Sequence, residues 1–358
     1  MTTPLVSVVM SVFNGEPFLG EAVDSILNQS FRDFEFVVID DGSTDSSGAI
    51  LDSYQEKDSR LRVLHQDNRG LIESLNRGCS IARGKYIARM DADDIAVRDR
   101  LLWQVEYLEK HPEVCVLGGA VELIDANGTS LGTDSNPLED RAIKSGLLRG
   151  NCPYYHGTVL MRREAFASVG GYRKIVVNAE DYDLWSRIAD RFQLANLEAV
   201  VLKYRRHPQQ ISVSRCRQQA LSWLAARTAA VARRNGNGDP LDSFKEITPA
   251  VLAGLGVSEA MQQTALASAY VTCLRSMSNA GEFSAALKVI DILQSSGWEH
   301  AENHVLADSR LAAAGLYWRQ RRFAKSIVTA AQGLIMRPII LGRPLKPLLR
   351  RLRVVGVQ

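Results

Sequence analysis

Three acidic side chains follow a short apolar stretch in the sequence YIARMDADDIAVRDR, residues 86 to 100. Asp91, Asp93 and Asp94 lie within four positions of one another, and like charges a few ångströms apart repel by roughly a few kcal/mol at a surface dielectric. A divalent cation, a nearby arginine or water alone can neutralise them. Oxygen ligands on a short turn suit Mg²⁺ or Mn²⁺, which complete their coordination shell with phosphate oxygens and water. The turn therefore predicts a metal ion that holds a diphosphate, and the alternative is an arginine-paired or solvated acidic turn.

Two other polar segments interrupt the apolar stretches near the N-terminus. SVFNGE begins at residue 11, and DDGSTDSS begins at residue 40. In the second segment Gly42 allows a tight bend, and the hydroxyl and carboxylate side chains after it can accept hydrogen bonds from the free amides of a following helix. One capping residue would be enough for that purpose. Helix capping therefore leaves the adjacent acids Asp40 and Asp41 unexplained.

The elements that must position these groups alternate between short apolar stretches and helical patterns over the first two hundred residues. Strands are expected in VSVVMSVF, FEFVVID, LRVLHQ and YIARMD, with helices between them. This alternation is typical of an α/β fold with a parallel sheet covered by helices on both faces, and FEFVVID has the near-continuous apolar composition of a buried central strand. Ligands of such folds bind at the carboxyl ends of the strands. The three polar segments should therefore converge on one crevice.

The alternation stops near residue 215, and the rest of the chain is rich in Ala and Leu at helical spacing. The segments GEFSAALKVIDIL (281–293) and RRFAKSIVTAAQGL (321–334) are similar and resemble the helix pairs of tetratricopeptide repeats, although their offset departs from the usual repeat of about 34 residues. A plain helical bundle is the alternative. The sequence therefore predicts three parts, an α/β domain at 1–215, an all-helical domain at 216–336 and a basic tail at 337–358.

The composition is that of a globular protein large enough for two domains, with 358 residues of which 46% are hydrophobic and 23% charged. The five cysteines are odd in number and scattered, so neither a disulfide framework nor a metal knuckle is expected, and a reducing compartment is favoured. The N-terminal stretch lacks the basic residues of a secretion signal, and no apolar stretch approaches the roughly 18 residues of a membrane span. We therefore expect a cytoplasmic protein.

The net charge of +3 conceals an asymmetry between the two ends of the chain. Residues 309–358 contain eleven basic residues and no acidic ones, which leaves 32 bases against 40 acids in residues 1–308. The tail sequence RPIILGRPLKPLLRRLR suits the anionic lipid headgroups at the inner face of a membrane. Nucleic acid is disfavoured as a partner because no aromatic residue for base stacking lies between 324 and 358. The alternative is a solvated end, since three prolines prevent one continuous helix.

Three motifs follow one another in the first 210 residues. They are VSVVMSVFNGEPFLGEAVDSILNQSFRDFEFVVIDDGSTD, then NRGLIESLNRGCSIARGKYIARMDADD, and then AEDYDLWSRI after HGTVLMRREAFASVGGY. Their order and spacing resemble the inverting glycosyltransferases of family 2. The resemblance implies the GT-A fold, a Rossmann-like α/β arrangement with a mostly parallel sheet, and it does not extend into the helical half.

The resemblance also implies a donor site for a nucleotide-sugar. Asp41 falls where family members accept a hydrogen bond from a ring nitrogen of the nucleotide base, and Asp40 would be its structural partner. Ser11 and Phe13 fall where family members touch the base or stack on it. A buried core position is the alternative for Phe13.

The same resemblance makes Asp91 the residue that faces the ribose and the metal, and Asp93 a direct ligand of Mn²⁺ or Mg²⁺. Asp94 is expected to support or cap this turn. His207, in YRRHPQQIS, is the third candidate ligand, and an ordinary surface or hydrogen-bonded histidine is the alternative. The metal would offset charge on the departing diphosphate.

Displacement with inversion also needs a general base that takes the proton of the acceptor hydroxyl on the side opposite the diphosphate. The resemblance selects Asp181. A helix is expected to begin near Glu180, and the i, i+4 spacing places Asp181 over Trp185, which would offer a face to a sugar ring or raise the carboxyl pKa by desolvation. An interaction with the helix dipole is the alternative for acids in the first turn. His156, in YYHGTVLMRR, is a further candidate on the acceptor side.

These features predict an inverting glycosyltransferase with a UDP-sugar as donor and a glycan or lipid-linked acceptor in surface-polysaccharide synthesis. A nucleotidyltransferase is disfavoured, because SVFNGE has one glycine where a phosphate-binding loop would need several. The remaining alternative is a non-catalytic helical scaffold that carries an inactive transferase domain.

Overall fold

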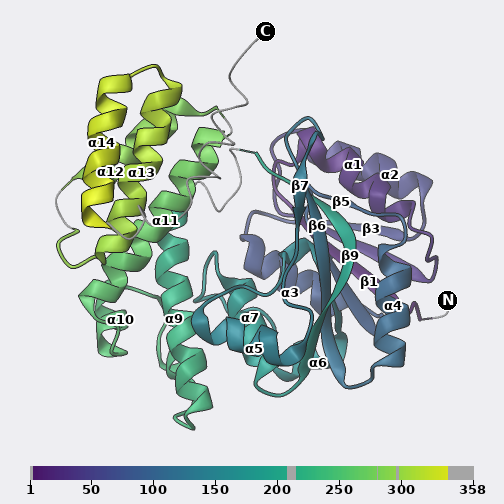
Figure 1. The fold of residues 1–358 in the computed structure, drawn as a ribbon. Helices are drawn as coiled ribbons and strands as arrows, with labels where there is room; N and C mark the ends of the chain where they lie inside the picture. Colours follow the sequence, from purple (N-terminus) through teal and green to yellow (C-terminus); the bar gives the residue numbers. More distant parts are fainter. Residues whose placement is uncertain (1–2, 208–214, 280, 296–297, 338–358) are drawn as a thin grey trace. The chain divides into compact units, whose positions relative to one another are not determined.

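The computed structural model describes residues 3–207, 215–279, 281–295 and 298–337 (Figure 1). The chain divides into two compact units. The first unit contains Met1–His207 and Ser222–Ile247, and the second contains Pro208–Leu221 and Thr248–Gln358.

One mixed sheet forms the centre of the first unit. Its described strands are β1 (Val6–Val12), β2 (Phe34–Asp40), β3 (Leu61–His65), β4 (Tyr86–Met90), β5 (Ile95–Ala96), β6 (Val114–Ile124), β7 (Ser130–Asp134), β8 (Leu160–Arg162) and β9 (Gln193–Arg205). Their order is β3-β2-β1-β4-β8-β6-β9-β5, and β7 pairs with β6. β1 to β4 pair in parallel, as do β6 and β9, whereas β8 runs antiparallel to both of its neighbours. The predicted mostly parallel sheet is confirmed.

Helices cover both faces of this sheet, as the alternating pattern predicts. They are α1 (Glu16–Leu27), α2 (Ser47–Lys57), α3 (Leu71–Ile81), α4 (Arg100–Lys110), α5 (Asp140–Arg149), α6 (Arg163–Ser168) and α7 (Glu180–Ala189), with the short 3₁₀ turns η1 (His156–Thr158) and η2 (Pro240–Ser243). α1, α2 and α4 share one apolar core with Val8 and Met10 of β1. α3 covers the opposite face, where a Cβ on Gly78 would lie 2.6 Å from Val9. Glycine therefore permits α3 to approach the sheet closely.

The described residues of the second unit are helical. α9 (Cys216–Arg234) begins in this unit and continues in the first, and it is followed by α10 (Pro249–Gly254), α11 (Glu259–Asn279), α12 (Phe283–Gln294), α13 (Asn303–Arg319) and α14 (Phe323–Met336). α11 with α12 and α13 with α14 form two successive helix pairs (Figure 1). The predicted all-helical C-terminal region is confirmed for the residues that the structure describes.

The two similar sequence segments occupy the same position in these two helix pairs. α12 begins at Phe283 and α14 at Phe323, and each helix follows a turn with one residue in the left-handed region, Gly281 (φ 80°) or Arg321 (φ 60°). A tetratricopeptide assignment for the pairs stays a prediction. Of the predicted basic tail only Arg337 is described, and residues 338–358 lie outside the described part of the chain.

The division between the units differs from the predicted boundary near residue 215. Residues 222–247 pack with the α/β unit, because the Trp223 indole Nε1 donates to the Gly150 carbonyl at 2.9 Å and the Asp239 carboxylate pairs with Arg173 at 2.8 Å. A change from strands to helices in the sequence therefore does not mark the end of the first unit. None of the described helices is long and apolar enough to cross a membrane.

Candidate active site

The carboxyl ends of β1, β2 and β4 lie side by side in the sheet. Val12 pairs with Asp40 across β1 and β2, and Met10 pairs with Met90 across β1 and β4. The Asp41 amide donates to the Val12 carbonyl at 2.8 Å. These registers bring the three polar segments to one edge of the sheet, so the expected convergence is confirmed.

Ser11 and Phe13 lie at this edge, where β1 ends. The Phe13 side chain is 53% exposed, so the alternative of a core position is wrong. Ser11 is half-buried. An exposed aromatic ring at the end of a central strand is suited to stacking on a planar ligand.

The loops after β1 and β2 are fastened to each other by hydrogen bonds. Asn14 lies in the left-handed region at φ 53°, and its side-chain oxygen accepts from the Thr44 amide at 2.8 Å. Asp45 serves two helix N-termini, because its carboxylate accepts from the amides of Glu16 (3.1 Å) and Ser47 (3.0 Å). The capping role predicted for this segment is confirmed for Asp45, which also connects α1 to α2.

The two adjacent acids at the end of β2 have different partners. Asp40 pairs with the His65 Nδ1 at 2.8 Å, and this contact is the first cause of a raised pKa for that imidazole. Asp41 is buried and accepts hydrogen bonds from Gln66 Nε2 (2.7 Å), the Arg69 amide (2.8 Å) and the Gly70 amide (2.8 Å). Two of these donors reach Oδ1 and one reaches Oδ2. Asp41 therefore fixes the loop before α3, and its Oδ2 keeps capacity for one more donor.

The acidic turn after β4 brings Asp91, Asp93 and Asp94 together, with one carboxylate oxygen of each within 4.8 Å of the others. Arg89, which is buried in β4, forms an ion pair with Asp91. Asp94 accepts from the Arg205 amide through Oδ1 at 2.8 Å, whereas its buried Oδ2 has no hydrogen-bond partner among the described residues. Arginine pairing, one of the alternatives open from the sequence, is thus present for Asp91.

Burial and mutual repulsion disfavour the charged form of this turn. Burial raises the pKa of Asp91 even though the Arg89 charge lowers it. Burial, followed by the charges of Asp93 and Asp91, raises the pKa of Asp94 well above its ordinary value. A buried carboxylate oxygen without a donor costs free energy that a bound cation would recover. The donor set of carboxylate oxygens fits Mg²⁺ or Mn²⁺.

His207 meets the acidic turn from the end of the first unit. Its Nε2 lies 2.8 Å from Asp93 Oδ2, and its Nδ1 is buried without a hydrogen-bond partner in the described part of the chain. The side chain is 10% exposed, which rules out an ordinary surface histidine, whereas the contact with Asp93 fits both a hydrogen-bonded histidine and the predicted metal ligand. Sequence reasoning therefore named three residues, Asp91, Asp93 and His207, that the fold brings to one place.

Asp181 lies in the first turn of α7, which begins at Glu180 as predicted. Its Oδ1 accepts from the Tyr182 amide at 2.6 Å, and its Oδ2 lies 3.7 Å from the Cys152 sulfur. Burial raises the pKa of Asp181. Burial, followed by the Asp181 charge, raises the pKa of the neighbouring Glu180 to about 8. The Arg89 charge acts on both carboxyl groups, which places the start of α7 within electrostatic reach of the acidic turn.

The expectation of a sugar-stacking surface on Trp185 is not supported. The side chain is fully buried and packs edge-on against Tyr154 and His156, with ring centroids 5.4 and 6.0 Å away. The i, i+4 spacing places Asp181 and Trp185 on the same side of α7, but the segment that carries Tyr154 and His156 covers Trp185. Trp185 therefore offers no exposed ring face, and the raised pKa of Asp181 is the part of the expectation that fits.

His156 is held between the acidic turn and α7. Its Nε2 lies 2.7 Å from the Tyr172 hydroxyl, and burial, followed by the Arg89 charge, holds the pKa of this imidazole well below its ordinary value. The next residue, Gly157, packs directly on the acidic turn, because a Cβ there would lie 3.0 Å from Asp94 Oδ2 and 3.2 Å from Asp91 Oδ2. Sequence reasoning missed Gly157, although a glycine directly after a candidate site histidine was visible.

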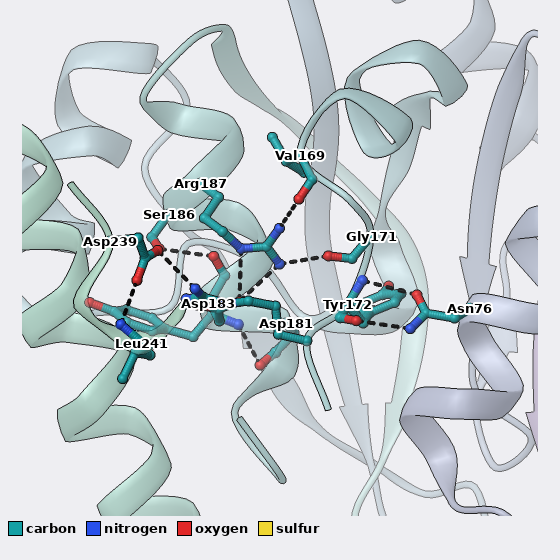
Figure 2. Close-up of polar contacts among 12 residues, drawn as sticks. Asn76, Val169, Gly171, Tyr172, Asp181, Asp183, Ser186, Arg187, Asp239 and Leu241 are labelled. Atoms are coloured by element: carbon teal, nitrogen blue, oxygen red, sulfur yellow. Dashed lines mark hydrogen bonds and ion pairs between the residues drawn. The ribbon is translucent and has the colours of Figure 1, made fainter. Parts of the chain in front are cut away.

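Sequence reasoning also missed the role of Asp183, two residues after Asp181. Asp183 is fully buried and is bound by two arginines, Arg173 and Arg187, whose Nε atoms lie 3.0 and 2.9 Å from Oδ2. Figure 2 shows the Arg187 guanidinium reaching from Asp183 to the carbonyl oxygens of Val169 (2.5 Å) and Gly171 (2.7 Å). The network fixes α7 to the loop that precedes it. The i, i+4 pair of Asp183 and Arg187 was the available signal.

Asp239 extends this network into the segment after α9. Its Oδ2 lies 2.8 Å from Arg173 and 2.7 Å from Arg233. Its Oδ1 accepts from the Leu241 amide (Figure 2). The Ser186 hydroxyl on α7 accepts from Arg233 at 3.0 Å. Residues 222–247 therefore help to hold the helix that carries Asp181.

The known sequences to which this chain is similar are glycosyltransferases. The family model "Glycosyl transferase family 2" matches residues 7–170. An uncharacterized glycosyltransferase of Haemophilus influenzae is 36% identical over 223 residues, which are 58% of this chain and 68% of that protein. The putative glycosyltransferase EpsE of Bacillus subtilis is 35% identical over 207 residues, which are 56% of this chain and 73% of that protein.

Solved structures with a similar fold have low sequence identity to this chain. S. aureus TarS 1–349 in complex with UDP-GlcNAc is 18% identical, with a TM-score of 0.54 and coverage of 94% of this chain and 92% of that chain. The mannosyltransferase PcManGT from Pyrobaculum calidifontis, in complex with GDP-Man and Mn²⁺, is 18% identical, with a TM-score of 0.50 and coverage of 93% and 88%. These matches concern the fold.

Proposed function

Given that the chain belongs to glycosyl transferase family 2 and transfers a sugar from a nucleotide-sugar, we propose that it is an inverting, metal-assisted enzyme with Asp181 as its general base. The observation that carries this proposal is the acidic turn at the carboxyl edge of the sheet, where three acids gather and the buried Asp94 Oδ2 has no hydrogen-bond partner among the described residues. Such a turn is costly without a ligand, and a cation with a diphosphate is the ligand that offsets it.

Asp91, Asp93 and His207 would hold Mn²⁺ or Mg²⁺, with Asp94 beside them. The bound ion would offset negative charge on the leaving diphosphate. The low pKa that burial gives His156 keeps a second imidazole near this turn neutral, so it adds no positive charge that would compete with a cation.

The donor nucleotide would bind at the edge formed by Ser11, Phe13 and Asp41. The exposed Phe13 ring is suited to stacking on the base, and Asp41 Oδ2 has the capacity to accept a hydrogen bond from a ring N–H. Uracil offers such an imide donor, which supports a UDP-sugar. S. aureus TarS, of similar fold, binds UDP-GlcNAc, whereas PcManGT binds GDP-Man, so both nucleotides belong in the test.

Asp181 would act on the acceptor hydroxyl. The Tyr182 amide holds Oδ1, and Oδ2, which lies 3.7 Å from the Cys152 thiol, would accept the hydroxyl proton as the hydroxyl oxygen bonds to the anomeric carbon and the bond to the nucleoside diphosphate breaks. The pKa raised by burial makes this carboxylate a stronger base than an exposed aspartate. The acceptor would be a glycan or lipid-linked sugar, with His156 on its side of the site, in the assembly of a surface polysaccharide.

Replacement of the base tests the proposal. Asp181→Asn should lower kcat about 10²–10⁴-fold, the usual contribution of a positioned general base, while Mn²⁺ and UDP bind as in the wild type. Glu164→Gln, at an exposed position on α6, is the control for the loss of one carboxylate and should keep transfer activity. Equal activity of Asp181→Asn and wild type would move the base elsewhere, and loss of UDP binding would make Asp181 part of the donor site.

A direct assay separates the enzyme from the non-catalytic scaffold alternative. The purified chain with Mn²⁺ is incubated with UDP-glucose, UDP-galactose, their N-acetyl forms and GDP-mannose, and release of the nucleoside diphosphate is measured. Slow hydrolysis of one donor is expected even without an acceptor. If none of them is hydrolysed and none binds, the scaffold alternative is favoured.

A further inference from the structure

The last described helix of the second unit exposes its apolar side. Phe323, Ile327, Val328 and Ile335 of α14 are 47%, 62%, 57% and 79% exposed. At 100° per residue these four side chains, together with exposed Ala324 and Ala331, lie on one face of the helix. We call this set of residues the α14 face. Scattered exposed apolar residues are normal, but a continuous apolar helix face marks a binding surface.

The side of α14 that packs in the fold is small and polar instead. Its buried residues are Ser326, Thr329 and Gly333. The Ser326 hydroxyl donates to the Ala314 carbonyl at 2.8 Å, and a Cβ on Gly333 would lie 3.0 Å from the Ala307 carbonyl. These short residues let α14 lie close to α13. The apolar residues therefore point outward because the packed side of the helix is already filled.

The equivalent helix of the preceding pair shows the ordinary arrangement. The positions 40 residues before Ser326, Thr329 and Gly333 are Ala286, Val289 and Leu293 in α12, and all three are buried apolar residues. α12 and α14 follow the same kind of turn but bury opposite chemical types. The inversion in α14 is thus a property of its sequence and not of the repeated architecture.

Aromatic and basic side chains accompany the α14 face near its N-terminal end, where Arg322 and Lys325 lie over the Tyr317 ring of α13. Trp318 of α13 is 47% exposed and meets Phe323 edge-on, with ring centroids 4.8 Å apart. Exposed bases follow it in the same stretch, namely Arg319, Arg321, Arg322 and Lys325. No acidic residue occurs from residue 309 to the end of the sequence. An apolar helix face with Trp at its end and exposed cations outside it is the combination that binds at the surface of an anionic bilayer.

We propose that the α14 face docks the protein on an anionic lipid surface, with α14 lying in the plane of the interface and its aliphatic side chains inserted among the lipids. Charge favours this occupant over a second copy of the chain, since pairing two α14 faces would bring their bases together. The hollow of about 430 Å³ beside α12, α13 and α14 includes Val328 but neither Ile327 nor Ile335, the two most exposed aliphatic side chains of the α14 face.

Vesicle binding by the full chain tests this proposal independently of any donor or acceptor. The wild type should sediment with vesicles of phosphatidylcholine and phosphatidylglycerol in equal parts, and far less with phosphatidylcholine alone or at high salt. The double variant Ile327→Ser with Ile335→Ser should bind roughly tenfold to one hundredfold more weakly, because each aliphatic side chain transferred from water contributes about tenfold. Both residues are exposed, so the fold is retained.

Ile292→Ser on α12 is the matched control. Ile292 is 40% exposed but lies outside the α14 face, so this variant should bind vesicles as the wild type does. Tryptophan emission should shift to the blue on vesicle binding, and the shift should be smaller in Trp318→Phe. The double variant keeps all eleven bases after residue 308, so vesicle binding equal to wild type would assign the membrane contact to the basic sequence and overturn the role of α14.

Two other outcomes would also overturn the proposal. If the wild type is dimeric in sedimentation velocity and the double variant is monomeric, the α14 face is an interface between copies of the chain. Absence of vesicle binding together with α14-dependent binding of an acidic protein would make it a protein-docking surface.

Discussion

Two groups of acidic residues in the first unit differ in how many partners their carboxylate oxygens have. At the acidic turn, Asp91 has one arginine, Asp93 has a histidine, and the buried Asp94 Oδ2 has no hydrogen-bond partner among the described residues. In the network at α7, Asp183 is bound by Arg173 and Arg187. Asp239 is bound by the same Arg173 and by Arg233. The first group has unsatisfied charge, which suits a ligand, and the second is satisfied, which suits structure.

The hydrogen-bond and ion-pair partners of the carboxylate oxygens therefore distinguish a ligand site from a structural network. The presence of several acidic residues does not, because both groups have them. Asp181 and Asp183 illustrate this point within one helical turn. Asp181 accepts one backbone hydrogen bond of 2.6 Å and has a raised pKa, whereas Asp183 is held by Arg173 and Arg187. The comparison predicts that removing charge at the two groups will have opposite consequences for stability and activity.

The largest expected effect is on stability. Asp183→Asn leaves Arg173 and Arg187 buried with too little negative charge, so the free energy of unfolding should fall by about 3–5 kcal/mol. Chemical denaturation followed by tryptophan fluorescence measures this change. Asp242→Asn is the matched control, because Asp242 is 74% exposed and lies 3.6 Å from the same Arg173. That variant should change stability by less than about 0.5 kcal/mol, and an equal loss in both would remove the distinction between the two groups.

The next effect is on catalysis without loss of stability. Asp93→Asn removes a carboxylate from the crowded turn, so kcat/KM should fall by about 10²–10³, while the unfolding temperature without metal stays equal or rises. Mn²⁺ should raise the unfolding temperature of the wild type but not of the variant. Glu106→Gln, an exposed position on α4, controls for the loss of one charge. Strong destabilisation by Asp93→Asn would mean that the turn is structural, like the network at α7.

The sequence predicted the parts of the fold that follow from local patterns. Alternating strands and helices indicated the sheet, and the acids after β4 indicated a ligand site before any register was known. The network at α7 had only one local signal, the i, i+4 pair of Asp183 and Arg187. Arg173 also binds Asp183, and it pairs with Asp239, which lies 66 residues after that arginine, so no local pattern announced these contacts. The predicted sugar-stacking surface on Trp185 was wrong because segments distant in the sequence cover this side chain. Helical spacing gives the side of a helix, but the segments that cover that side come from elsewhere in the chain.

The dependence of stability on pH gives a smaller effect. Glu180 has a pKa raised from 4.5 to about 8, so the folded protein binds a proton that the unfolded chain releases between these values. The stability of the wild type should therefore fall as the pH rises from about 5 to about 8. Glu180→Gln lacks this titration, so relative to wild type it should gain about 1–3 kcal/mol across that window, measured by urea unfolding at several pH values. A constant difference between the two proteins would show that Glu180 is ionised in the folded state.

The smallest expected effect is on kcat, and it comes from a residue of the structural network at α7. Asp239 is outside the reacting centre, but it pairs with Arg173, which binds Asp183 on the helix that carries Asp181. Asp239→Asn should cost about 1–2 kcal/mol of stability and lower kcat a few-fold with an unchanged KM for the donor, because the base is less well held while the donor edge is intact. Asp239→Glu should restore part of kcat if the ion pair matters. Asp239 follows α9 and so lies beyond the alternating strands and helices. A loss of kcat with unchanged donor KM would show that this segment supports catalysis in the α/β unit. A raised donor KM would show instead that the segment affects donor binding at the edge formed by β1 and β2.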